Sequence, residues 1–550
     1  MIQIKIKFLI LIKFLIAGIF VFLITNNYYK QKNQLNLKKK RIIKKNMIFI
    51  KGQYKSLEEF SGQRFSDESI LEVNYFKKPT DPIIESNIIE TFSNLPYLKT
   101  LIIEPDYDSC PSDIEFLTIL ISNLKKCTKL STLSIKLGGI NMSEHIEALS
   151  QGLVNLPNLS NLNLDLSYCK IEEQKISILG SQLAQCHNLS ILAIDLENNF
   201  NDLSINGSNF AYNLALGISK CAKLSELTLK LGSNQLDGKA QSNICSALDN
   251  CSNLKKLRLY LCSNRIEGNG LLGYSSNIFI FPSFKSVSTL FLDFSHNSLD
   301  GQHASQFGAA LSQCQNLQNL ELIIRGNEIG AEGTANLAQG LAKCQNLQKL
   351  KLQIDNNKIG DDGISELANA LMKLPELSDL SLLLKSNNIK DKGIANFSSK
   401  LPQFVNLKYL QLDLWYNRIG SLGAYFLGEK LKQCINFSTL ILELQYNKIN
   451  YEGALSLSKS LTNLTNLQYL KFDLRFSKIG YFGPSEVIST LANCQNLRIL
   501  YLGFGENNID DQEELLKRKI MRIKQLTQFE LNLYDDFGEV SDDSGEEMDD

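Results

Sequence analysis

The side chains best suited to catalysis or metal binding are few and widely separated in this sequence of 550 residues. Its four histidines, His145, His187, His296 and His303, have no partner at the spacing of a metal site or a Ser/His/Asp arrangement. No pair of carboxylates stands out as a general acid and base. We therefore expect no catalytic residue, no cofactor and no metal ion, and the sequence predicts a non-enzymatic protein.

The cysteines follow a repeated pattern rather than a metal-binding one. Eight of the twelve stand three residues before a recurring apolar residue: Cys127, Cys186, Cys221, Cys251, Cys314, Cys344, Cys434 and Cys494. Other copies of the pattern have Leu156, Leu374, Phe404 or Leu464 there, so the position is an apolar packing position. No Cys-x-x-Cys pair is present. We expect buried, reduced thiols, which favour a cytosolic compartment for the repeats.

The pattern is an internal repeat that settles at 30 residues. Its copies open at Leu98, Leu130, Leu159, Leu189, Leu224, Leu254, Val287, Leu317, Leu347, Leu377, Leu407, Phe437, Leu467, Leu497 and Leu526, which predicts fifteen coils. Within one copy, Leu320, Leu322 and Ile324 alternate as in a strand that is buried on one face, and Leu337 and Leu341 share a helix face. We expect an α/β leucine-rich-repeat solenoid, a horseshoe with a parallel sheet on its concave face and helices on its convex face.

The turn after each strand also repeats. Asparagine stands there at positions 199, 234, 264, 297, 327, 357, 387, 417, 447 and 507, with Cys169 and Ser477 in its place in two copies. A side-chain amide can bond both the N–H and the C=O groups that lose their partners where the chain leaves the sheet. The glycines that follow, such as Gly330, Gly360, Gly420 and Gly480, predict positive φ at the turn into the helix.

These motifs resemble the ribonuclease-inhibitor-like class of leucine-rich repeats, over about residues 98–533. The Asn-x-Ile-Gly-x-x-Gly and Leu-x-x-Cys-x-Asn-Leu copies look most like the expanded arrays of ciliate proteins, some of which follow a protein-kinase domain. Asp536-Phe537-Gly538 spells a kinase metal-binding triplet, but no His-Arg-Asp loop or glycine-rich loop accompanies it. The resemblance implies a fold rather than an activity.

The repeat also predicts which side chains face the concave side. If Leu320, Leu322 and Ile324 are buried, then residues 321, 323 and 325 and their equivalents face solvent. The second and third of these positions give the candidate protein-binding face: Asp355, Leu383, Lys385, Asp413, Trp415, Glu443, Gln445, Asp473 and Arg475. An exposed tryptophan with a polar rim is typical of an interface anchor. Insertions around Phe200–Phe210 and Gly268–Phe281 are alternative recognition loops.

The two ends of the chain have opposite charge. We expect a signal-anchor or transmembrane segment at 1–29, a basic juxtamembrane stretch at 30–46, an irregular N-terminal cap at 47–97, the repeats at 98–534 and a disordered acidic tail at 535–550. Phe8–Ile24 would anchor the chain, and the basic residues after it would keep the repeats in the cytosol. If translation starts at Met47, the chain is instead soluble and cytoplasmic. Ser541 and Ser544 are candidate phosphorylation sites in the tail.

The sequence thus predicts an interaction scaffold. We expect the concave face to bind a protein partner with basic and apolar groups, and we expect no nucleic-acid binding, because the basic residues cluster only beside the N-terminal apolar run. A regulator of a small GTPase is the alternative, on resemblance to Ran-type GTPase activators, which combine similar repeats with an acidic tail. A receptor-type protein fits less well with the row of free cysteines.

Overall fold

The computed structural model describes residues 47–51, 69–76, 86, 89–90, 95, 98–105, 111–200, 208–266, 284–507, 509 and 512–533. The chain divides into two compact units, residues 1–169 and 170–550. The expected anchor, the basic stretch, the acidic tail with Ser541 and Ser544, and most of both insertions lie outside the described residues.

The described residues of the first unit form five parallel strands paired in chain order: β1 (Met47–Lys51), β2 (Ser69–Phe76), β3 (Leu98–Pro105), β4 (Thr132–Lys136) and β5 (Asn161–Asp165). Helices α4 (Pro111–Asn123) and α5 (Ile146–Val154) and the 3₁₀ turn η1 (Leu124–Lys126) connect the later strands. The expectation of an irregular segment over 47–97 was wrong, because β1 and β2 lie within it. β1 has two isoleucines and a phenylalanine, and β2 has an isoleucine, a valine and two aromatic residues, all of which favour extended backbone.

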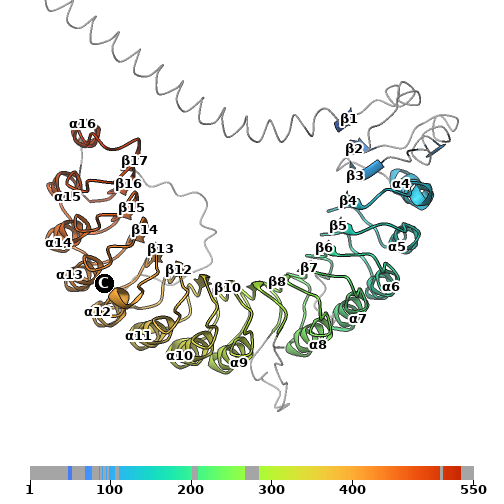
Figure 1. Cartoon of the computed structure of the whole chain (residues 1–550), viewed down its shortest axis with the longest axis horizontal. Coiled ribbons are helices and arrows are strands. Elements are labelled where there is room, and N and C mark those ends of the chain that lie inside the picture. Colours follow the sequence, from blue (N-terminus) through green and yellow to red (C-terminus); the bar gives the residue numbers. More distant parts are fainter. Residues whose placement is uncertain are drawn as a thin grey trace, which may run out of the picture. The chain divides into compact units, whose positions relative to one another are not determined.

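The second unit repeats strand and helix along its length. Its strands are β6 (Ile191–Asp195), β7 (Glu226–Lys230), β8 (Lys256–Tyr260), β9 (Thr289–Asp293), β10 (Asn319–Ile323), β11 (Lys349–Gln353), β12 (Asp379–Leu383), β13 (Tyr409–Asp413), β14 (Thr439–Glu443), β15 (Tyr469–Asp473), β16 (Ile499–Gly503) and β17 (Gln528–Asn532). Its helices are α6 (Glu173–Leu183), α7 (Ser208–Ser219), α8 (Gly238–Leu248), α9 (Gly301–Leu311), α10 (Gly330–Leu341), α11 (Gly360–Leu371), α12 (Asp391–Ser398), α13 (Ser421–Leu431), α14 (Tyr451–Leu461), α15 (Gly483–Leu491) and α16 (Glu513–Met521), with a 3₁₀ turn η2 at Leu401–Gln403. Figure 1 shows these strands on the inner side of an arc and the helices on its outer side.

The core lies between these two layers, as the alternation predicted. Leu320, Leu322 and Ile324 have exposed fractions of 2%, 0% and 0%, and Leu337 and Leu341 of α10 are fully buried against them. Parallel strands are about 4.8 Å apart, whereas packed helices need about 8–10 Å, so the helical layer is longer and the stack curves. The fold is an α/β leucine-rich-repeat solenoid with its sheet on the concave face. Strands β3 to β17 correspond to the fifteen expected copies, and β1 and β2 come before them in the chain.

The asparagine row satisfies the turns in the way the sequence predicted. Asn417 Nδ2 donates to the backbone oxygens of Leu384 and Leu414, both at 3.0 Å. Asn417 Oδ1 accepts from the backbone N–H groups of Asn387 at 3.1 Å and Ile389 at 3.0 Å. One side chain therefore links two neighbouring coils, and it is 6% exposed.

The glycines at the turn into the helix follow the prediction only in part. Gly330, Gly360 and Gly480 have φ of +65°, +58° and +68°. Gly420 instead has φ of −95° and precedes α13 as an extended residue. Its N–H donates to Asp391 Oδ1 at 2.6 Å, so the side chain of the preceding coil supports that turn and no positive φ is needed.

The described cysteines form no disulfides, and all except Cys262 are buried. Burial raises the pKa of the Cys314 and Cys434 thiols to about 12 and that of Cys344 to about 11. These thiols are therefore protonated and act as small apolar side chains. Phe200 and Phe210 are buried as well, with ring centroids 4.4 Å apart, so they hold the ends of one insertion in the core.

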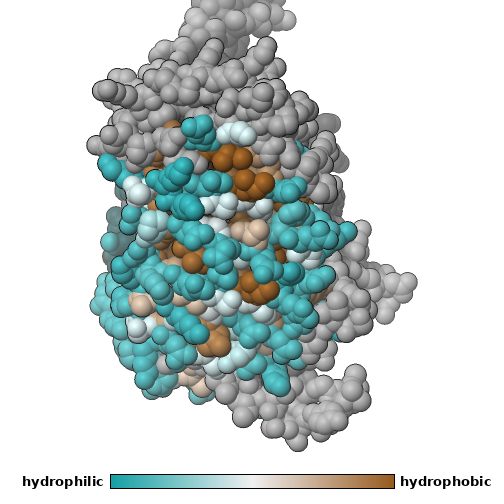
Figure 2. All heavy atoms as spheres, turned by 90° about the vertical axis from the view of Figure 1, so that its right-hand side faces the viewer, coloured by the Kyte–Doolittle hydropathy of each residue, from teal (hydrophilic) through white to brown (hydrophobic). Residues whose placement is uncertain are grey.

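The outer surface shown in Figure 2 is mostly hydrophilic, with small separate groups of hydrophobic residues. Large apolar side chains on α4 and α7 that reach the surface are about one third exposed: Ile119 36%, Tyr212 37% and Leu216 36%. Among the helices of the described residues, none is long and apolar enough to cross a membrane.

Candidate binding surface

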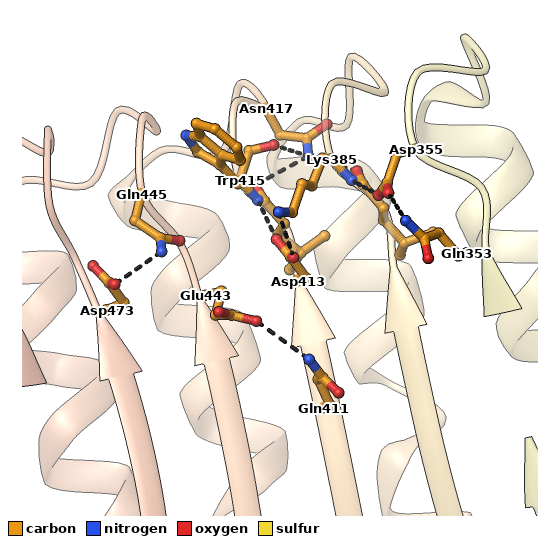
Figure 3. Close-up of polar contacts among 12 residues, drawn as sticks. Gln353, Asp355, Lys385, Gln411, Asp413, Trp415, Asn417, Glu443, Gln445 and Asp473 are labelled. Carbon is orange, nitrogen blue, oxygen red and sulfur yellow. Dashed lines mark hydrogen bonds and ion pairs between the residues drawn. The ribbon is translucent and has the colours of Figure 1, made fainter. Parts of the chain in front are cut away.

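The nine predicted residues come together because β11 to β15 pair in register. Asp413 of β13 is aligned with Leu383 of β12 on one side and Glu443 of β14 on the other, and Glu443 is aligned with Asp473 of β15. Trp415, two residues after Asp413, lies on the same face at the end of its strand. We call these nine residues the concave cluster; Figure 3 shows most of them along the strand ends.

Asp413 is at the centre of the concave cluster and is 3% exposed. Its Oδ2 lies 3.3 Å from Lys385 Nζ, and its Oδ1 accepts from the Trp415 backbone N–H at 3.2 Å. Burial raises the pKa of this carboxyl to about 7, with nearby Glu443 adding to the rise and Lys385 opposing it. Asp413 is therefore a buried acid that is partly protonated near neutral pH.

The other carboxylates of the concave cluster have their own partners. Glu443 pairs with Lys471 and accepts from Gln411 Nε2 at 3.3 Å. Asp473 accepts from Arg475 Nε at 3.1 Å with both oxygens, and from Gln445 Nε2 at 2.8 Å. Arg475 Nη2 also lies 2.9 Å from Asp473 Oδ2, so two guanidinium nitrogens contact the carboxylate and fix the arginine geometry.

Asp355, the first member of the concave cluster along the chain, links its own coil to the following one. Its Oδ2 accepts from Gln353 Nε2 and its Oδ1 from the Lys385 backbone N–H, both at 2.8 Å. Leu383, the apolar member of the middle column, lies between Gln353 and Asp413 in the strand register. Lys385 is thus held at its backbone by Asp355 and at its ammonium group by Asp413.

Trp415 is the aromatic centre of the surface. Lys385 Nζ lies 4.7 Å from the centroid of its ring, and the ring of Tyr446 lies 5.8 Å away. Two buried polar atoms here, Trp415 Nε1 and Gln445 Oε1, have no hydrogen-bond partner among the described residues. One is a donor and the other an acceptor, and they come from neighbouring coils (Figure 3).

The sequence analysis expected these side chains to be open to solvent, and for four of them that was wrong. Asp355, Asp413 and Asp473 have exposed fractions of 3%, 3% and 4%, and Gln445 of 8%. Trp415 is half-buried rather than exposed. The physical reason is the close spacing of parallel strands, because each side chain on the concave face is covered by longer neighbours two residues away and one coil away.

The sequence analysis left out the first of the three outward positions, the one equivalent to residue 321, and the residues next to it. Lys471 is the partner of Glu443, and its pKa is raised because hydrogen bonding and charge from Glu443 outweigh the desolvation that would lower it. Tyr409 Oη donates to Gln411 Oε1 at 3.2 Å, and the rings of Tyr469 and Tyr501 lie 5.4 Å apart. The 30-residue repeat could have identified these residues, because each lies two or four residues before a middle-column position such as Asp413 or Asp473.

Beyond Tyr409 the concave face continues into an open groove. It has a volume of about 280 Å³ and is lined by residues of β8 to β13, among them Phe291, Glu321, Lys351 and Tyr409. Lys351 Nζ and Glu321 Oε1 are 2.6 Å apart across it. In the part of the chain that the structure describes, no group of histidine, cysteine and carboxylate side chains could hold a metal ion.

A family model described as "Leucine Rich repeat" matches residues 343–368 and 439–458. The chain contains leucine-rich repeats. No curated protein matches it.

Among solved structures, the chain is similar to the leucine-rich-repeat ectodomain of the plant membrane receptor kinase GASSHO1/SCHENGEN3 from Arabidopsis thaliana, in complex with CASPARIAN STRIP INTEGRITY FACTOR 2. The match has 16% identity and a TM-score of 0.29, and covers 84% of this chain and 61% of that one. The chain therefore corresponds to about three fifths of that ectodomain's length. The assignment to ribonuclease-inhibitor-like repeats of the ciliate type stays a prediction.

Proposed function

We propose that this leucine-rich-repeat protein is a non-enzymatic scaffold that binds a protein partner on the concave cluster. The observation that carries the proposal is the pair of unpartnered polar atoms, Trp415 Nε1 and Gln445 Oε1, at the centre of an aromatic surface. Buried polar atoms usually have partners, because leaving one unpaired costs about 1–3 kcal/mol. Neither atom is open to solvent in the unbound chain, so a partner that donates to Gln445 and accepts from Trp415 would satisfy both once these two side chains turn outward.

The surroundings of Trp415 support a preformed interface. Its ring is held by Lys385, and Lys385 is held by Asp413 and Asp355. Side chains that are already ordered lose little entropy on binding. Tryptophan, tyrosine and arginine are also the residue types that contribute most to binding energy at protein interfaces.

The charges indicate what the partner presents. The concave cluster and Lys471 together contain four carboxylates, Asp355, Asp413, Glu443 and Asp473, against three cations, Lys385, Lys471 and Arg475. If all four carboxylates are ionised, one negative charge is left over, and partial protonation of Asp413 lowers it further, so most of the negative charge is neutralised within the surface. We infer a partner that buries mainly apolar or aromatic groups against Trp415 and adds a basic group near Asp413.

The proposed location follows from the cysteines and the N-terminal sequence. The described thiols are free, as expected in a reducing compartment. We propose that the repeats are cytosolic and that Phe8–Ile24 anchors them to a membrane; with translation from Met47 the protein would be cytoplasmic without this anchor.

The test is capture of partners from the native cell with the full chain as bait. The site variant carries Trp415→Ala and Gln445→Ala. The matched control carries Ser295→Ala and Arg325→Ala, which are the equivalents of Trp415 and Gln445 four coils earlier. Circular dichroism confirms that each variant folds. We expect at least one partner that binds the wild type and the control but not the site variant.

A partner found in this way is then purified and its Kd measured against the three forms. Loss of a central tryptophan typically weakens an interface by about 2 kcal/mol or more, roughly 30-fold in Kd. Equal Kd values for all three forms would remove the concave cluster as the binding site.

A further inference from the structure

The side of the repeats where strands end and helices begin carries exposed apolar side chains at α13 to α15. Leu422 in the first turn of α13 is 56% exposed, and Tyr451 at the start of α14 is 38% exposed. Just before α15, Tyr481 is 51% and Phe482 72% exposed, with their rings 5.1 Å apart. We call this region, residues 416–426, 446–452 and 476–482, the helix-entry edge.

The 30-residue register shows that this composition is local. Leu422 and Phe482 occupy the same repeat position as Glu332, Asp362 and Lys392 in α10, α11 and α12. Those three coils have charged residues where α13 has leucine and the turn before α15 has phenylalanine, while α14, between them, keeps a charged residue, Glu452. Single exposed apolar residues are common on protein surfaces, whereas a group of them on consecutive coils marks an interaction site.

A row of aromatic rings extends the edge toward the concave cluster. Tyr416 is 54% exposed, and the rings of Tyr446 and Phe476 are stacked with centroids 4.0 Å apart. All three residues have φ of +52° or +53°, where bulky side chains are rare. Two preceding coils have Gly326 and Asn356 at this position, residue types that accept such a backbone readily.

Cations lie between the aromatic side chains. Arg418, Lys448 and Lys478 are exposed and occupy one repeat position, and short parallel bridges join their segments to the coils before them. None of the three makes an ion pair among the described residues, whereas Lys358 at the same position pairs with Glu328 at 3.3 Å. Glu452 is exposed and is the carboxylate of the helix-entry edge. With these three cations, the edge carries a net charge of +2.

We propose that the helix-entry edge docks onto an anionic phospholipid membrane. Exposed Phe, Leu and Tyr side chains interleaved with unpaired Lys and Arg are the composition of surfaces that insert shallowly among lipid headgroups. Single-stranded nucleic acid fits less well, because Leu422 offers no ring for base stacking and Tyr446 and Phe476 stack on each other. Docking would present the repeats edge-on and leave the concave cluster open to a partner, and it does not depend on Phe8–Ile24.

The chain has a single tryptophan, so replacing it gives a background in which one added tryptophan is the only source of tryptophan emission. In the full chain with Trp415→Phe, a reporter is placed on the edge with Phe482→Trp. The matched control has Glu332→Trp, at the same repeat position in α10, in the same background. Each protein is mixed with vesicles of phosphatidylcholine alone or with added phosphatidylserine, and with vesicles whose acyl chains are brominated. Tryptophan emission and its quenching by bromine report insertion at the chosen residue, whichever other segment tethers the chain.

We expect Trp emission at position 482 to shift to the blue and to be quenched with phosphatidylserine vesicles, and emission at position 332 to stay unchanged. Changing Arg418, Lys448 and Lys478 to Gln should raise the lipid concentration needed for half-maximal quenching at position 482 by roughly tenfold or more, because three attractions to the anionic surface are lost. Equal behaviour of the two reporters would overturn the proposal. So would emission at position 482 that responds to single-stranded oligonucleotides but not to vesicles.

Discussion

Replacing Asp413 with asparagine tests the electrostatics of the concave cluster directly. Asparagine has nearly the same shape and keeps an oxygen that can accept from the Trp415 backbone N–H, but it cannot ionise. Lys385 loses its charged partner, while its backbone N–H still donates to Asp355. The variant therefore removes one titration and leaves most of the contacts in place.

The magnitude follows from the pKa, which rises from 3.8 to about 7 on folding. Between these pH values the folded protein keeps a proton that the unfolded chain has lost, so raising the pH favours unfolding. At about 1.4 kcal/mol for each pH unit, the wild type loses about 4 kcal/mol of stability across this window. From about pH 5 to about pH 8 the loss is roughly 3 kcal/mol, and Asp413→Asn lacks it.

Two measurements check this. Urea unfolding at about pH 5 and about pH 8, followed by circular dichroism, should show the stability of Asp413→Asn relative to wild type rising by roughly 3 kcal/mol. Trp415 emission in the native wild type should titrate with a midpoint near pH 7 and should not do so in the variant. Asp293→Asn, at the same position in the β9 coil, is the control, and Trp415 emission in this variant should change with pH as it does in the wild type. A flat Trp415 emission in the wild type, or the same midpoint in Asp413→Asn, would refute the reasoning.

Four further predictions concern the rest of the chain. Ser477→Asn should raise the free energy of unfolding by about 1–3 kcal/mol in urea melts, because Ser477 Oγ is buried without a partner where other coils have the asparagine contacts; a lower stability would contradict this. The buried thiols with pKa values of about 11 to about 12 should react with a thiol reagent at neutral pH only after unfolding, and fast reaction of these buried thiols in the folded chain would show that they are accessible. Intact-mass analysis should find phosphate on Ser541 or Ser544 in cells, and an unmodified tail would count against acid-directed phosphorylation. If the alternative function holds, the full chain should accelerate GTP hydrolysis by a small GTPase, and unchanged rates across a panel would exclude it for those GTPases.

Much of the architecture was predictable because each coil obeys the same local rule. The alternation at Leu320, Leu322 and Ile324 determines which strand face is buried, and Asn417 bonds to backbone groups that every coil presents at the same turn. A prediction for one copy therefore holds for its neighbours. The prediction failed where a segment departs from the repeat, as at β1 and β2, or where a side chain from another coil replaces a local solution, as at Gly420.

The sequence alone determined the repeat, its register and therefore which residues share the concave face, because a fixed period places equivalent residues side by side. It could not determine how deeply those residues are buried or how they pair. Asp413, Glu443 and Asp473 read as one acidic row, yet Lys385, Lys471 and Arg475 neutralise each of them across or along the strands. That outcome depends on the length and direction of side chains from several coils at once. The pKa of Asp413 and the unpaired atoms beside Trp415 arise from the same packing, and only the tertiary structure decided them.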